Sequence, residues 1–168
     1  MTKISNLHTR PSPQSLKWIE RYDEVRTRTL ALTATLTSED QMVQSMPEAS
    51  PVKWHLAHTT WFFETFVLVP HVGDYVPVDP TFGFLFNSYY KRLGNHPARA
   101  IRGTFSRPTL GQVLDYRAQV DRCVRQLLDR ETFAEILRLL ELGLNHEQQH
   151  QELIVTDIKH GFWTNPLR

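Results

Sequence analysis

The sequence predicts an all-α fold, a four-helix bundle with a long aromatic and arginine-rich loop between the second and third helices. Two observations carry this prediction. Apolar residues recur with a helical period in four separate stretches, and each stretch opens on a helix-start signal, either serine followed by proline or a capping box. The chain of 168 residues suits one domain, which we take to cover residues 1–168.

The first two helices each follow a serine–proline pair, a cap with proline in the first helical position. The pair at residues 12–13 starts a helix that we expect to run to about Leu36, and the pair at residues 50–51 starts one that keeps its apolar period to Pro70. On the inner face of the first helix we expect Leu16, Ile19, Tyr22, Val25, Leu30 and Leu32.

Capping boxes predict the starts of the last two helices. In a capping box, a threonine and a glutamine or glutamate three residues later accept hydrogen bonds from each other's backbone N–H groups. Thr109–Gln112 opens a helix that continues through Leu127, and Thr132–Glu135 opens a long one that should end near Gly161. The apolar residues expected on or near the inner face of the long helix are Phe133, Ile136, Leu137, Leu140, Leu144, Leu153, Ile154 and Ile158.

Residues 70–108 break the helical pattern with frequent prolines and glycines, yet they are too aromatic for a disordered linker. We therefore expect this loop to pack on the bundle through Tyr75, Phe82, Phe84, Leu85, Phe86, Tyr89, Tyr90 and Phe105. Its five cations could bind a carboxylate or could simply be solvated surface charge: Lys91, Arg92, Arg99, Arg102 and Arg107.

Composition narrows the class of protein. A formal net charge of +1 is too even for electrostatic capture of nucleic acid, so small molecules or proteins are the expected partners. Cys123 is the single cysteine, and no stretch is apolar enough for a signal peptide or a membrane span. We expect a cytoplasmic protein with no nucleic-acid or membrane partner.

Two histidines four residues apart, His146 and His150, lie on one face of the long predicted helix, which is the spacing of a metal-chelating pair. Burying two imidazoles on a leucine-rich face is costly without partners, and a divalent cation would satisfy their lone pairs. The second helix offers a third imidazole, either His55 or His58, and spacing alone does not choose between them.

The same residues match H-E-x-x-H, in which Glu147 would act as the general base of a zinc protease. The extended form of that motif needs a glycine and a histidine where this chain has Leu153 and Thr156. We therefore interpret Glu147 as structural.

Four stretches together resemble the N-terminal DinB-type domain of the ergothioneine-biosynthesis sulfoxide synthases, the EgtB family. They are Met46–Glu64, Leu85–Tyr90, Arg102–Gly103 together with Ser106–Thr109, and Asn145–Glu152. Members of that family use dioxygen to join the sulfur of a cysteine-containing thiol to the imidazole of trimethylhistidine, a histidine betaine, and the product is a sulfoxide.

The resemblance implies a non-haem iron(II) held by His58, His146 and His150, which leaves His55 outside the ligand set. Zinc(II) or another divalent metal is the alternative, because imidazole accepts several metals. The resemblance further implies that Gln149 contacts the histidine-derived substrate and that Arg99 and Arg102 bind the carboxylate of the thiol. It assigns no other catalytic residue to this chain.

Enzymes of that family carry a second, C-terminal domain of the formylglycine-generating type, which this sequence does not include. We expect the reaction to need that domain, which either a separately encoded partner or the remainder of a longer gene would supply. Two other hypotheses stay open: a stand-alone DinB-type transferase that uses a divalent metal to activate a thiol, and a non-catalytic metal-stabilised module that docks a protein through the loop Phe82–Tyr90.

Overall fold

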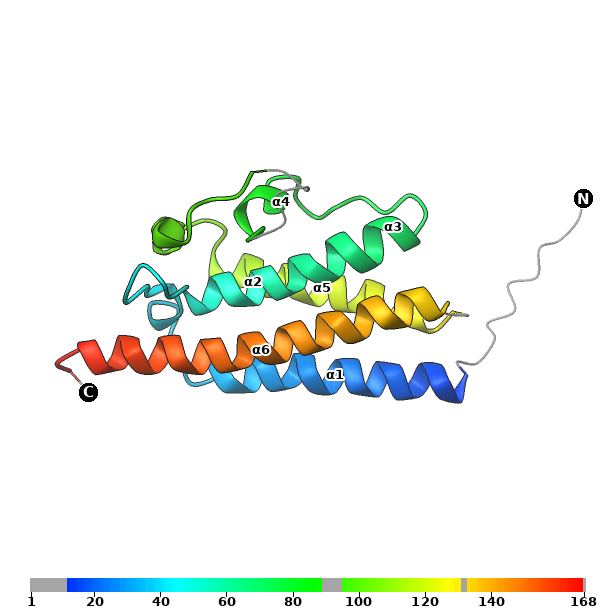
Figure 1. Cartoon of the computed structure of the whole chain (residues 1–168), viewed down its shortest axis with the longest axis horizontal. Helices are drawn as coiled ribbons and strands as arrows, with labels where there is room; N and C mark the ends of the chain where they lie inside the picture. Colours follow the sequence, from blue (N-terminus) through cyan, green and yellow to red (C-terminus); the bar gives the residue numbers. More distant parts are fainter. Residues whose placement is uncertain (1–11, 89–94, 131–132, 168) are drawn as a thin grey trace, which may run out of the picture.

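The computed structural model describes residues 12–88, 95–130 and 133–167. Within these ranges every regular element is helical, so the prediction of an all-α fold is confirmed. The longest helices lie alongside one another (Figure 1): α1 (Pro13–Thr33), α2 (Val52–Phe63), α5 (Leu110–Leu128) and α6 (Ala134–Thr164). α1 and α6 run in one direction and α2 and α5 in the other. No helix of the described part is both long and apolar enough to cross a lipid bilayer.

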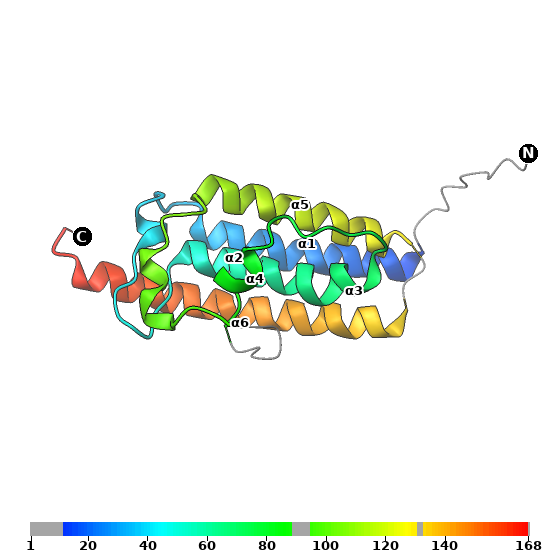
Figure 2. The ribbon, with the colours of Figure 1, turned by 90° about the horizontal axis from the view of Figure 1, so that it is seen from above.

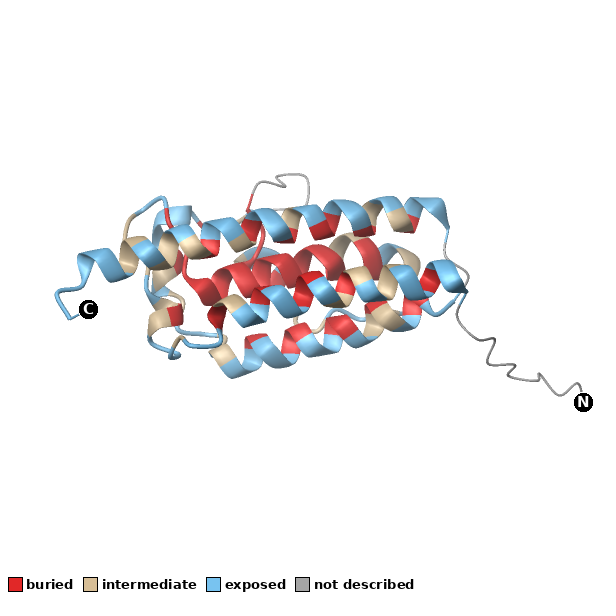
Figure 3. Cartoon of the chain, turned by 90° about the horizontal axis from the view of Figure 1, so that it is seen from below, coloured by how far each residue is buried: buried red, intermediate tan, exposed pale blue. Residues whose placement is uncertain are grey.

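Helix α2 is the centre of the core. All of its residues are buried, and it packs against both α5 and α6 (Figure 3). It continues through a π-helical segment, η2 (Glu64–Leu68), into the short α3 (Val69–His71), so the predicted end near Pro70 agrees with the structure. The predicted start was displaced by one residue, because Pro51 takes the N-cap position and Ser50 lies before the helix.

The inner face predicted for the first helix was partly wrong. Tyr22 and Val25 are buried, but Leu16 and Leu30 are 47% and 37% exposed, and α1 ends at Thr33. In their place α1 buries polar residues, above all Arg26, which is only 2% exposed. The periodicity of apolar residues could not anticipate this, because Arg26 is stabilised by acidic side chains from α5 and α6.

The predicted capping box at the start of α5 is present: Thr109 Oγ1 accepts from the backbone N–H of Gln112, and Gln112 Oε1 accepts from that of Thr109. At the start of α6, Thr132 lies outside the described residues, and Phe133 takes the N-cap position with its side chain 73% exposed. The rest of the predicted inner face of α6 is buried or half-buried, apart from Leu153, and the helix runs on to Thr164.

The described parts of the segment between α3 and α5 lie along the outside of α2 (Figure 2) and include α4 (Phe82–Leu85) and the 3₁₀ helix η4 (Arg99–Thr104). As expected, it packs on the core, with Phe82 and Phe86 buried, whereas Phe84 is 48% exposed. Its far end is held by a buried lysine, Lys53, whose Nζ donates to three backbone carbonyls, those of Phe105, Ser106 and Pro108. Tyr89, Tyr90, Lys91 and Arg92 lie outside the described residues.

Candidate metal centre

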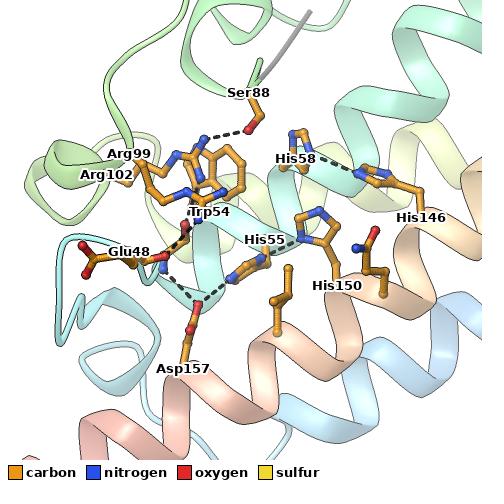
Figure 4. A pocket seen from close by; sticks show the side chains of 13 residues that line it. Glu48, Trp54, His55, His58, Ser88, Arg99, Arg102, His146, His150 and Asp157 are labelled. Carbon is orange, nitrogen blue, oxygen red and sulfur yellow. Dashed lines mark hydrogen bonds and ion pairs between the residues drawn. The ribbon is translucent and has the colours of Figure 1, made fainter.

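Three histidines from two helices meet in one small volume. Nε2 of His58, on α2, lies 3.2 Å from Nε2 of His146, on α6. One ring nitrogen from each of His58, His146 and His150 lies within 4.8 Å of the other two (Figure 4). The structure therefore brings together the three histidines that the sequence and its family resemblance predicted as ligands.

A glycine allows the two helices to approach closely at this point. Gly143 lies on α6, one turn before His146, and a Cβ added there would lie 2.5 Å from Cε1 of Phe63 and 3.0 Å from Cε1 of Phe62. Ordinary contacts between carbon atoms are about 3.5–4.0 Å. Only glycine fits this position without displacing the buried rings of Phe62 and Phe63, and the close approach of the helices lets His58 reach the two histidines of α6.

The outer ring nitrogens of these histidines differ in their surroundings. Nδ1 of His58 donates to the backbone oxygen of Phe86 at 2.5 Å, and Nδ1 of His150 lies 2.8 Å from Nδ1 of His55. Nδ1 of His146 is buried and has no hydrogen-bond partner among the described residues. The carbonyl of Phe86 leaves the lone pair of His58 on Nε2, which is the nitrogen that faces His146.

Burial lowers the pKa of all three imidazoles, because it disfavours the charged form. The pKa of His146 falls to about 4, although Glu147 opposes the shift, and that of His58 is lowered further by the nearby His146. The three rings are therefore neutral at pH 7, the state in which imidazole binds metals. A divalent cation suits this donor set. Tetrahedral bonds of about 2.0–2.1 Å place ligand nitrogens roughly 3.3 Å apart. The nitrogens of His58 and His146 are already 3.2 Å apart, and all three donor atoms lie within 4.8 Å of one another, so side-chain adjustment would close the set around a cation.

Glu147 faces away from the histidines, into a buried network of charges. Its carboxylate is completely buried and accepts from Arg26 at 2.8 Å, from Thr29 at 2.6 Å and from Arg117. Burial by itself would raise the pKa of Glu147, but the two guanidinium groups outweigh it and hold the pKa at about 2. A carboxylate fixed in this way cannot act on a water in the histidine cluster, which supports the structural interpretation and excludes the zinc-protease role.

A cavity of about 520 Å³ opens beside the histidine cluster. Its walls include all three residues predicted to bind substrate, Gln149 from α6 and Arg99 and Arg102 from η4. Arg107, by contrast, is exposed and does not line this cavity. The predicted cationic cluster is therefore reduced, within the described residues, to two arginines near the histidines.

Arg102 is the more firmly held of the two arginines. It is 3% exposed, donates to the hydroxyls of Ser50 and Ser88 at 3.0 Å each, and lies 3.4 Å above the centre of the Trp54 ring (Figure 4). Trp54 in turn stacks on His58, with ring centres 4.5 Å apart. Trp54 was not predicted as a site residue, although its position four residues before His58 on the same helix face was a usable signal.

In a comparison with known protein families, residues 21–154 match a model of the DinB superfamily. The matched span contains the three histidines, the cavity-lining arginines and Gln149. A search of curated proteins gives no match.

Proposed function

The chain belongs to the DinB superfamily, and on this basis we propose that its helices form a four-helix bundle of the DinB type whose task is to hold a divalent metal for thiol chemistry. The ligands in this proposal are His58, His146 and His150. One observation carries it: three buried, neutral imidazoles turn ring nitrogens toward one another at the wall of a cavity.

The finer part of the proposal is that the metal is iron(II) and the reaction is that of a sulfoxide synthase. A thiol, the imidazole C–H of a histidine betaine and dioxygen would give a sulfoxide-linked product and water. When bound, iron(II) would supply a site that activates dioxygen, whose four electrons come from the thiol and the imidazole C–H, and a positive charge that favours thiolate over thiol. Three neutral ligands leave that charge intact and leave coordination positions open.

The remaining residues of the cavity suit the recognition of such substrates. The guanidinium of Arg102 is oriented in advance by Ser50, Ser88 and Trp54, so little freedom would be lost when it pairs with a carboxylate. Arg99 lies beside it on η4, and the Gln149 amide can accept or donate a hydrogen bond to a histidine-derived ligand. We further propose that a domain of the formylglycine-generating type covers the open side of the cavity.

Metal binding is tested first. The chain is loaded with iron(II) under nitrogen, desalted and analysed for bound metal. We expect one equivalent in the parent protein and in a control, His71→Ala, whose histidine lies on α3 away from the cluster. His58→Ala and His146→Ala should each retain little or none. Binding by His58→Ala equal to that of the parent would overturn the proposal.

A zinc-dependent thiol transferase is the second candidate, because the same three-nitrogen set with an open position is typical of zinc enzymes. Dioxygen separates the two reactions: a transferase turns over under nitrogen, and a sulfoxide synthase does not. The assay therefore has two arms: thiol and trimethylhistidine with and without oxygen, and thiol with an electrophilic acceptor under nitrogen. Docking of a protein through the loop Phe82–Tyr90 stays a prediction; of the loop's described phenylalanines, Phe82 and Phe86 are buried and only Phe84 is exposed.

A further inference from the structure

Behind the histidine cluster, an aspartate and a histidine form a hydrogen-bonded chain that ends on one of the proposed ligands. Oδ2 of Asp157 lies 3.1 Å from Nε2 of His55, and Nδ1 of His55 lies 2.8 Å from Nδ1 of His150 (Figure 4). His55 is 3% exposed, and His150 is 8% exposed. The chain joins α6 to α2 and returns to α6.

The contact between Asp157 and His55 determines which partner donates in the contact between His55 and His150. An ionised carboxylate only accepts hydrogen bonds, so a neutral His55 must carry its hydrogen on Nε2, which faces Asp157. Its Nδ1 then has a lone pair, and the 2.8 Å contact requires the hydrogen to be on Nδ1 of His150. A neutral imidazole carries one N–H, so the lone pair of His150 is on Nε2.

The aspartate itself is fixed in place. Its Oδ2 also accepts the backbone N–H of Ser50 at 2.9 Å, just before α2 begins. The carboxylate therefore has two partners from the start of α2, one backbone and one side chain. This arrangement orients His55 within a segment that already holds Arg102 through the hydroxyl of Ser50.

We propose that Asp157 and His55 are positioning residues that fix the tautomer and ring orientation of His150, so that its Nε2 faces the bound cation. The inference rests on the proposed metal site. The backbone oxygen of Phe86 does the same for His58, from the other side of the cluster. His55 itself is not a ligand here, because it lies outside the group of three whose donor atoms are mutually within 4.8 Å.

The test compares zinc dissociation constants, measured by competition with a chromophoric chelator. His55→Leu removes the acceptor for His150, and Asp157→Asn offers His55 an amide that can also donate, so both should weaken binding by about 10–100-fold. His55→Gln keeps an acceptor oxygen and should remain within about threefold of the parent. Glu152→Gln, which removes an exposed carboxylate from the same helix, is the matched control.

A second readout separates positioning from a general structural role. In the zinc-loaded, ¹⁵N-labelled parent, long-range ¹H–¹⁵N spectra should show His150 protonated at Nδ1 and metal-bound at Nε2. In Asp157→Asn and His55→Leu this pattern should be lost or mixed, while circular dichroism reports intact helices. A merely structural role would lower the melting temperature and leave the pattern unchanged.

The outcomes for this inference and for the metal site can be told apart. Parent-like zinc affinity and an unchanged His150 tautomer in folded Asp157→Asn would overturn the positioning role and leave the three-histidine site standing. Absence of zinc and iron binding by the parent chain would overturn both. If His55→Leu does not fold, Asp157→Asn and His55→Gln still decide the question, because they keep the polarity of the site.

Discussion

Replacing Glu147 by glutamine tests the buried charge network with almost no change in side-chain size. The carboxylate accepts hydrogen bonds from Arg26, Thr29 and Arg117, and these two arginines are 2% and 1% exposed. Glutamine offers one acceptor oxygen, and its NH₂ group would face guanidinium groups that can only donate. At least one arginine would therefore lose its hydrogen bond to residue 147 in the core.

Glu147→Gln should lower the free energy of unfolding strongly, because the charges of Arg26 and Arg117 are buried away from water. Asp121 still pairs with Nε of Arg26 at 2.7 Å, but among the described residues Arg117 forms an ion pair with Glu147 alone. Breaking a buried ion pair by removing one partner typically costs about 3–5 kcal/mol, out of a total stability of about 5–15 kcal/mol. With a urea m-value of about 2 kcal/mol/M, the unfolding midpoint should fall by roughly 2 M.

The assay is urea unfolding of the metal-free protein, followed by far-ultraviolet circular dichroism. Glu152→Gln on the exposed face of α6 should change the free energy of unfolding by no more than about 0.5 kcal/mol. Arg117→Met should cost less in the Glu147→Gln background than in the parent, since the two residues are coupled. A Glu147→Gln protein within about 1 kcal/mol of the parent would refute the reasoning.

Three further predictions follow from the packing and the buried imidazoles. Gly143→Ala should destabilise the fold by about 1–3 kcal/mol and weaken zinc binding, because the new methyl group collides with Phe63 and pushes α2 from α6; parent-like denaturation and zinc titration curves would contradict this. Lys53→Met should lower the melting temperature, since three backbone carbonyls lose their donor, whereas Lys159→Met on the exposed surface should not. The metal-free protein should lose stability as the pH falls from about 6.5 towards 4. Over this range His146 binds a proton in the unfolded chain but stays neutral in the folded protein. Each such histidine contributes a slope of up to roughly 1.4 kcal/mol per pH unit, so His146→Ala should flatten the curve measured by urea unfolding across this range.

The sequence predicted helices well where local signals decide them. The capping box of α5 and the unbroken apolar run of α2 depend on residues close together in the chain, and both were found. The buried face of α1 depends instead on partners about a hundred residues away: Arg26 reaches Asp121 and Glu147, and Tyr22 donates to the same Asp121 at 2.7 Å. A periodicity of apolar residues cannot show that a buried arginine is stabilised by acidic side chains far away in the sequence.

The candidate site shows the same division between local and long-range information. The four-residue spacing of His146 and His150 fixes them on one stripe of α6, and Asp157, seven residues further on, lies on that stripe too. α2 runs antiparallel to α6, so a step of three residues forward along α2, about 4.5 Å, matches a step of one turn backward along α6. His58 therefore meets His146, while His55 falls between His150 and Asp157. Two histidines that look equivalent in the sequence thus have different neighbours. His58 faces the other lone pairs of the cluster. His55 faces a carboxylate, which makes it a hydrogen-bond acceptor for His150.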